Sequence, residues 1–166
     1  MSFLRYILMM FLLLLGFESQ AARYALVIGN ADYRAMTSLH NPAADAEDMA
    51  AALGNLKFQV TPLINASKRE MDETLGNFYE QVKQQNAAHE VIVYFSGHGL
   101  QHEGANHLIP IDASLKQRAD IPYMTVNAQQ ILDNLHEINS TGVNLLILDA
   151  CRDVPNQLKS LVKGGD

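Results

Sequence analysis

The feature that most constrains this chain is a set of short apolar runs separated by segments of helical periodicity. The runs cover residues 24–28, 58–64, 91–95 and 143–148, and most are rich in β-branched residues. Short runs of this kind, bounded by glycine or polar residues, are typical of buried strands. The alternation therefore predicts an α/β domain with a mostly parallel sheet and helices on both faces. Because Pro62 cannot donate to a sheet ladder, we expect the second strand at an edge.

Three segments between or before these runs have the pattern of amphipathic helices. Asn41 and Pro42 form a predicted helix start, with the asparagine side chain as the cap and the proline in the first turn. Ser67 and Glu70 have the spacing of a capping box. The apolar stripes consist of Ala46, Met49, Ala50 and Leu53 in the first helix, Met71, Leu75, Phe78, Tyr79 and Val82 in the second, and Ile131, Leu132, Leu135 and Ile138 in the third.

The first 22 residues have the parts of a secretory signal peptide. Arg5 precedes an apolar run over residues 6–17, and the small residues Ser19 and Ala21 follow it. This run is shorter than the roughly 20 apolar residues that a bilayer span requires. We therefore expect cleavage after Ala21 or Ala22 and export to the periplasm or the medium. A membrane anchor formed by an uncleaved signal is the alternative.

Charge and cysteine content narrow the function of the remaining chain. The formal net charge is −6 and no basic stripe is visible, so a nucleic-acid partner is not expected. Residues 23–160 are long enough for one domain, and residues 161–166 are expected to form a disordered tail. An exported chain whose single cysteine is Cys151 cannot form an internal disulfide bond. This favours a chemical role for the thiol.

His98 and Cys151 each lie three residues beyond a predicted strand. Because the carboxyl ends of parallel strands meet at one edge of a sheet, we expect both residues at the same rim. An imidazole can hold the proton of a thiol and later deliver it to a leaving amine, so we predict His98 as the base and Cys151 as the nucleophile. The N–H groups of Gly99 and Cys151 are candidate oxyanion donors. A buried cysteine or a lone histidine is more often structural, but their joint placement favours catalysis.

A metal site formed by His98, His102 and His107 is an alternative, since zinc takes three such ligands with one open position. Glycines at positions 97, 99 and 104 make a helix improbable here, and so the histidines need not share a face. No carboxylate-rich motif accompanies them. The sequence therefore assigns no metal ligand and no cofactor, and it predicts that His102 and His107 are solvated loop residues.

Several blocks of sequence resemble, in their order, the caspase-like cysteine peptidases, especially the bacterial metacaspase branch. The blocks are ALVIGN at residues 25–30, LHNPAADA at 39–46, YFSGHG at 94–99 and LDACR at 148–152. Caspases place their histidine about 50 residues before the nucleophilic cysteine, and here the separation is 53 residues. The resemblance covers residues 23–153 and implies that residues 23–160 form a large-subunit, p20-like domain.

The resemblance also has implications for specificity. Caspases have glutamine two positions before the nucleophile, whereas this chain has Asp149. In metacaspases the matching aspartate and one from the Asn-Pro-x-x-Asp block line a pocket for arginine or lysine, which implies Asp149 and Asp45 as substrate-binding residues. Alternatively, Asp45 is a first-turn carboxylate that complements the helix dipole.

Fifteen residues follow Cys151, whereas the family continues with a small-subunit segment that completes the sheet. We therefore expect a caspase-like fold without that segment. The first functional hypothesis is a Cys–His endopeptidase that cleaves protein or peptide substrates after Arg or Lys. The second is a catalytically incomplete interaction module that needs a second chain or an oligomer to complete its cleft. A thiol hydrolase like gingipain or legumain is the third. Many metacaspases need calcium, so the resemblance allows calcium without assigning its ligands.

Overall fold

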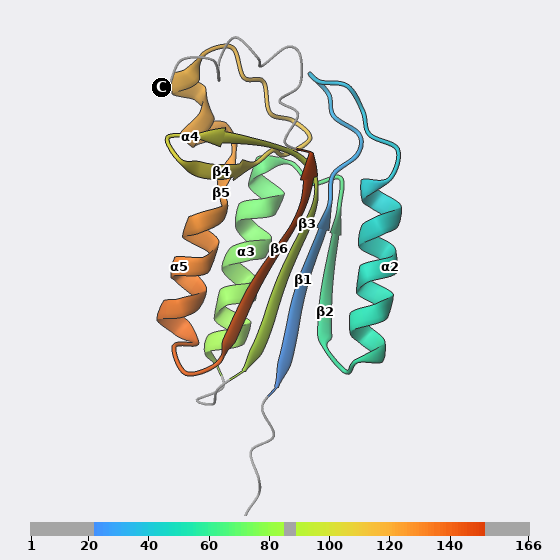
Figure 1. The fold of residues 1–166 in the computed structure, drawn as a ribbon, viewed down its shortest axis with the longest axis vertical. Helices are drawn as coiled ribbons and strands as arrows, with labels where there is room; N and C mark the ends of the chain where they lie inside the picture. Colours follow the sequence, from blue (N-terminus) through green and yellow to red (C-terminus); the bar gives the residue numbers. More distant parts are fainter. Residues whose placement is uncertain (1–21, 85–88, 152–166) are drawn as a thin grey trace, which may run out of the picture.

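The computed structural model describes residues 22–84 and 89–151, apart from the side chain of Cys151. A parallel sheet forms the centre of the domain, with the strand order β2-β1-β3-β6 (Figure 1). Its strands are β1 (Arg23–Gly29), β2 (Gln59–Ile64), β3 (Glu90–His102) and β6 (Val143–Cys151). The predicted α/β fold is confirmed. The edge position of Pro62 is also confirmed, because β2 pairs only with β1 among the described strands.

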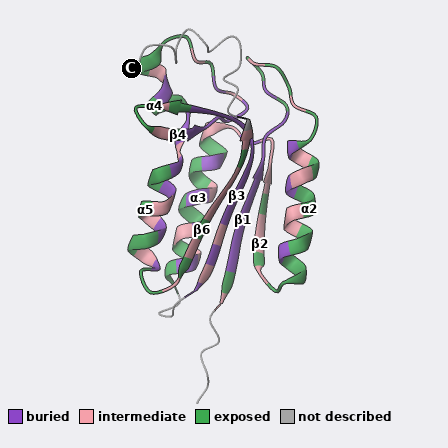
Figure 2. Ribbon diagram, viewed as in Figure 1, coloured by how far each residue is buried: buried purple, intermediate pink, exposed green. Residues whose placement is uncertain are grey.

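Helices cover both faces of this sheet, as Figure 1 shows. Helix α2 (Pro42–Asn55) packs on one face, where Ala46 and Leu53 contact buried residues of β1 and β3. Helices α3 (Lys68–Lys83) and α5 (Ala128–Ile138) pack on the other face. Side chains of β1 alternate between the two cores, and every residue from Tyr24 to Gly29 is buried (Figure 2).

The helix starts follow the sequence in part. Ser67 and Glu70 form the predicted capping box at the start of α3. The predicted helix start is confirmed, since α2 begins at Pro42 with Asn41 before it, but the predicted side-chain cap was wrong: the Asn41 backbone is already helical (φ −97°, ψ −31°) and its side chain makes no capping hydrogen bond. An effective capping side chain requires an extended backbone at the cap, as Ser67 has. Asn127, also extended, caps α5 with its side chain, and α5 begins three residues before the predicted apolar stripe.

Strand β3 continues well beyond its apolar run and then turns back into a hairpin. It pairs antiparallel with β4 (Ala105–Leu108), and β4 pairs in turn with β5 (Val126–Asn127). The two-residue turn consists of Glu103 (φ 49°) and Gly104 (φ 80°), and positive φ at both positions matches a type I′ hairpin. Between β4 and β5 lie a short 3-10 helix (Arg118–Asp120) and α4 (Ile121–Met124).

One edge of the parallel sheet carries exposed apolar side chains. Strand β6 pairs only with β3 among the described strands, and Val143 and Leu145 are 63% and 46% exposed. None of the helices in the described ranges has the length and hydrophobicity that a bilayer crossing requires. The predicted signal peptide, except for its last residue, and the predicted tail lie outside the described residues.

Candidate active site

His98 lies where β3 exchanges one neighbouring strand for another. The last pair between β1 and β3 joins Gly29 to Ser96, and the pairing with β4 begins at Gly99. His98 therefore lies in the short gap between the two partners. Its position within a strand, rather than after one, differs from the prediction, because hairpin pairing extends β3 beyond the parallel sheet.

Hydrogen bonding at His98 leaves one ring nitrogen without a partner. Nε2 lies 2.8 Å from the carbonyl oxygen of Thr37, in the loop after β1. Because a carbonyl oxygen only accepts, Nε2 carries the hydrogen of the neutral ring. Nδ1 is buried and has no hydrogen-bond partner among the described residues. The imidazole is thus fixed in one tautomer, with a basic nitrogen available at Nδ1.

The backbone register places Cys151 next to His98. Strands β3 and β6 are parallel, and His98 and Cys151 are partners at their last shared position. Neighbouring strands lie about 4.8 Å apart, so the two backbones are close enough for a Cys–His pair. The side chain of Cys151 lies outside the described part of the chain. The catalytic roles of both residues stay predictions.

Gly99 lies one residue further along β3. The N–H of His98 donates to the Tyr33 hydroxyl and its carbonyl accepts from Ile109 N, so both point away from β6. Because successive backbone groups alternate in direction along a strand, the N–H of Gly99 points toward the backbone of Cys151. A Cβ atom at Gly99 would lie 3.1 Å from the Cβ of Ala150, so glycine permits this close approach. The oxyanion roles of the Gly99 and Cys151 N–H groups stay predictions.

The two candidate specificity carboxylates share one neighbour, the hydroxyl of Tyr94. This hydroxyl donates to Oδ2 of Asp149 over 3.3 Å. Burial raises the pKa of Tyr94, and the charges of Asp149 and Asp45 raise it further. The structure thus brings together an exposed strand residue, Asp149, and a half-buried helix residue, Asp45. Sequence reasoning missed Tyr94, although its position in the YFSGHG block was a usable signal.

The three histidines of the alternative metal site do not converge. His102 and His107 lie across the β3–β4 hairpin with ring centroids 5.8 Å apart, while His98 binds Thr37 instead. His107 is buried rather than solvated, and its Nδ1 contacts Oγ1 of Thr125 over 2.8 Å. Burial, followed by the neighbouring His102, lowers the pKa of His107. Within residues 22–84 and 89–150, no group of three or more His, Asp or Glu side chains could hold a metal ion.

A hollow of about 440 Å³ lies between the β3–β4 turn, α5 and strand β6. Its lining comes from the β3–β4 turn, from α5 and from Leu146 and Leu148 of β6. A second hollow, of about 300 Å³, lies between α3 and α5 on the face opposite α2. His98 is not among the described residues that line either hollow.

Fold and site together define an α/β domain with a histidine and a cysteine on adjoining strands at the carboxyl edge of a parallel sheet. Within this class, the chain belongs to the caspase domain family of peptidases, peptidase C14, which it matches over residues 22–164. The family resemblance of the sequence is thereby confirmed. The metacaspase branch stays a prediction.

Similar proteins agree with this family. The chain is 30% identical over 133 residues to mucosa-associated lymphoid tissue lymphoma translocation protein 1 of Homo sapiens, covering 78% of this chain and 15% of that protein. It is 27% identical over 144 residues to the paracaspase of Dictyostelium discoideum, covering 85% of this chain and 34% of that one. The chain thus spans between 15% and 34% of the length of these relatives.

A crystal structure of a protein from Geobacter sulfurreducens shares the fold, with a TM-score of 0.59 and 20% identity. The match covers 78% of this chain and 50% of that one.

Proposed function

We propose that this chain is a cysteine endopeptidase that uses Cys151 and His98 and cleaves after Arg or Lys. The observation that carries the proposal is the His98 ring, anchored at Nε2 by Thr37 with Nδ1 unpartnered, at the register position of Cys151. A buried ring nitrogen without a partner is costly, and a thiol on the adjoining strand would relieve that cost. Family membership supports the same chemistry.

The proposed reaction begins with transfer of the thiol proton of Cys151 to Nδ1 of His98. The thiolate attacks the scissile carbonyl carbon, a C–S bond forms, and the carbonyl π electrons move to the oxygen. Collapse of this intermediate breaks the C–N bond, and the amine leaves with the proton from Nδ1. Water then attacks the thioester and gives its proton to Nδ1. Collapse of this second intermediate breaks the C–S bond and releases the carboxylic acid, and the proton on Nδ1 passes to the thiolate of Cys151.

The oxyanion step requires a local adjustment of the strand ends. N–H groups of Gly99 and Cys151 would stabilise the developing oxygen charge, as preorganised donors do in acyl transfer. Because the Gly99 N–H points toward the Cys151 backbone, substrate would have to part the last position of the β3–β6 pairing. A substrate side chain of positive charge would then lie near Asp149 and Asp45.

The test is hydrolysis of fluorogenic peptides that differ only in the residue before the cleavage site: Arg, Lys, Gln or Asp. Purified mature chain is assayed alone and with added calcium, with Cys151→Ala and His98→Ala as matched controls. Turnover of the Arg and Lys peptides that both variants lose supports the proposal. Turnover that survives in Cys151→Ala, or a preference for Asp, would refute it.

A second candidate is a module that needs a further chain to complete its cleft. The observation behind it is the outer edge of β6, which pairs with no other strand within the described ranges and exposes Val143 and Leu145. An unpaired, apolar strand edge is a template for another strand. Analytical ultracentrifugation, combined with the peptide assay at the same chain concentrations, separates the candidates. Turnover by a strictly monomeric chain argues against the module, and turnover that appears only when the chain associates supports it.

The localisation is also a proposal: residues 1–22 direct export, and the mature chain is periplasmic or secreted. The alternative of an uncleaved anchor is distinguished by membrane fractionation followed by a carbonate wash. Recovery of the chain in the wash supernatant supports a cleaved signal, and retention in the pellet supports the anchor.

A further inference from the structure

We propose that Tyr33 is a positioning residue that holds His98 in the orientation needed for catalysis. The inference rests on the proposed peptidase function and assigns a role to a residue outside the predicted site. Tyr33 lies in the loop after β1, four residues before Thr37 in the same loop. Its side chain is only 5% exposed.

The first line of argument is the contact between the two rings. The rings of Tyr33 and His98 have centroids 4.5 Å apart and an interplanar angle of 48°. One side of the imidazole therefore packs on the phenol ring, while Nε2 binds the Thr37 carbonyl. Two contacts from one loop fix both the tilt and the tautomer of the ring. Nδ1 is the atom that neither contact occupies.

The second line is a closed circuit of hydrogen bonds around the His98 backbone. The N–H of His98 donates to the Tyr33 hydroxyl over 2.7 Å, and that hydroxyl donates to the carbonyl of Ile109 over 3.2 Å. The N–H of Ile109 donates to the carbonyl oxygen of His98 over 3.0 Å, which closes the circuit. Tyr33 thus substitutes for a strand neighbour at the position where β1 has ended and β4 has not begun.

A phenol is well suited to this place because it both accepts and donates while remaining neutral. Burial raises the pKa of Tyr33, so the hydroxyl keeps the proton that it donates to Ile109. The ring itself is held in a small apolar cluster with Leu100, Ile109 and Ile121. The Tyr33 side chain is therefore held in place by packed residues, although its backbone lies in a loop.

Gly97 supports the same assignment from the steric side. A Cβ atom there would lie 2.6 Å from the Tyr33 hydroxyl and 2.9 Å from a ring carbon of Phe95. Its φ of 155° is also unfavourable for residues with a side chain. Glycine before His98 thus leaves the space that the Tyr33 hydroxyl fills.

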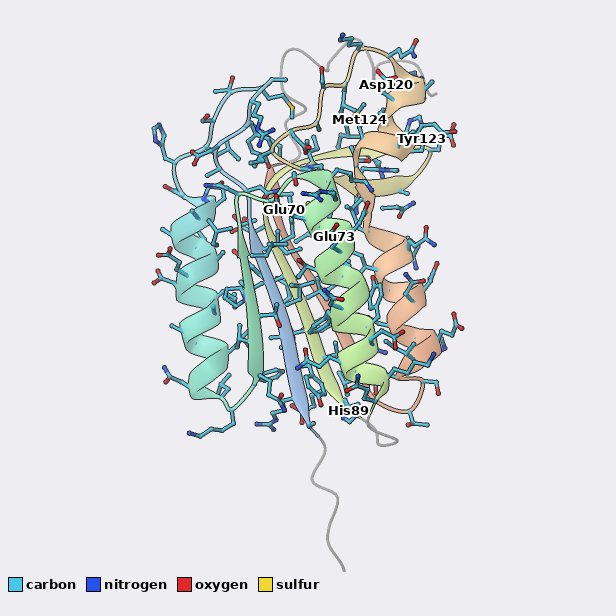
Figure 3. All side chains as sticks on the ribbon, turned by 180° about the vertical axis from the view of Figure 1, so that it is seen from behind. Glu70, Glu73, His89, Asp120, Tyr123 and Met124 are labelled. Carbon is cyan, nitrogen blue, oxygen red and sulfur yellow. The ribbon has the colours of Figure 1, made fainter. Side chains whose placement is uncertain are left out.

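The experiment compares Tyr33→Phe with Tyr24→Phe. Tyr24 is a matched control because it is buried on β1 and its ring meets a histidine, His89, with centroids 5.3 Å apart. That pair lies at the other end of the sheet; Figure 3 shows His89 far from Tyr123 of α4. Cys151 is the only cysteine, so iodoacetamide reports on one thiol without background. The readouts are the pH midpoint of alkylation, kcat and KM on an Arg peptide, and thermal unfolding.

Tyr33→Phe is expected to lower kcat by about 10- to 100-fold with KM within about twofold, because misplacing a base by an ångström costs up to about 10²-fold. Its alkylation midpoint is expected to rise toward the ordinary thiol value of about 8.5, because a misoriented imidazole no longer stabilises the thiolate. Tyr24→Phe is expected to change thermal unfolding alone. Unchanged kcat and midpoint in Tyr33→Phe, or equal changes in Tyr24→Phe, would overturn the inference.

The alkylation arm also separates this inference from the proposed function. If the wild-type chain cleaves no peptide but Tyr33→Phe still raises the alkylation midpoint of Cys151, the proposed peptidase function is refuted. The positioning role of Tyr33 is supported in that case. If Tyr33→Phe does not fold, hydrogen exchange of the His98 amide in the wild-type chain replaces it, since the bond to the buried Tyr33 hydroxyl should protect this N–H from exchange. An unprotected His98 amide would then overturn the inference.

Discussion

Replacing Asp149 with asparagine tests the proposed specificity most directly, because the change removes a charge and keeps the shape. Asp149 accepts a hydrogen bond from Tyr94, and an asparagine oxygen can accept the same bond. The substitution is therefore expected to leave the domain folded. What it removes is the attraction between the carboxylate and an arginine or lysine of the substrate.

The expected magnitude follows from the exposure of the site. Two unit charges 4 Å apart interact by about 4 kcal/mol at an effective dielectric constant of 20, and by about 1 kcal/mol in water. Asp149 is exposed in this structure, and Asp45 supplies a second carboxylate near the same Tyr94 hydroxyl. A loss of about 1.4–2.8 kcal/mol is therefore reasonable, or roughly 10- to 100-fold in kcat/KM on Arg peptides.

The assay is the ratio of kcat/KM on an Arg peptide to that on an otherwise identical Gln peptide. Asp133→Asn is the control, since it removes the same charge from an exposed position on α5, on the other face of the sheet. If Asp45→Asn lowers the ratio too, the double variant shows whether the two carboxylates act on one substrate group. If Asp45 only complements the dipole of its helix, Asp45→Asn lowers the stability of the domain and leaves the ratio unchanged. An Asp149→Asn variant with the wild-type ratio would refute the pocket assignment.

Three further predictions concern stability and processing. Gly29→Ala should destabilise the domain by about 1–3 kcal/mol, because the added Cβ would overlap the Pro42 carbonyl oxygen. Gly76→Ala is the control, since a Cβ there meets nothing within 4 Å. Equal urea unfolding midpoints for the two variants would contradict this prediction. Because the folded state lowers the pKa of His107, its contribution to stability should be complete above the unfolded pKa of 6.5 and should decline as the pH falls below that value. His107→Gln should therefore reduce the dependence of the free energy of unfolding on pH, measured by urea titration. An unchanged pH dependence would argue against this prediction. N-terminal sequencing of exported protein should begin near Ala22, and an intact Met1 in a soluble cytoplasmic pool would oppose export.

Much of the central sheet could be predicted from local pattern. The two central strands, β1 and β3, are buried on both faces, so each contains a nearly continuous apolar run that composition alone identifies. The capping box at Ser67 and the edge position of Pro62 are equally local, since each depends on a few neighbouring residues. Asn41 shows the limit of such rules. Its residue type suits a cap, but its backbone has a helical conformation and its side chain makes no capping hydrogen bond.

The hairpin from β3 to β4 shows what local pattern misses. His102 is a polar residue at the end of β3 and Asn106 is a polar residue in the short strand β4, and the strand conformation of both depends on the pairing of these two segments rather than on an apolar run. The Glu103-Gly104 turn was a weak signal, because glycine permits the positive φ that a type I′ turn requires. His107, predicted as a solvated loop residue, is buried for the same reason.

By itself the sequence determined the alternation of strands and helices, the family and the candidate residues His98, Cys151, Asp149 and Asp45. Tertiary structure alone decided which side chains surround them. Thr37 and Tyr33 lie more than sixty positions before His98, yet one fixes its ring nitrogen and the other its backbone. Such contacts carry no periodicity, because they form between a loop and a distant strand that only the packed sheet brings together. The orientation of the proposed base is therefore a property of the fold.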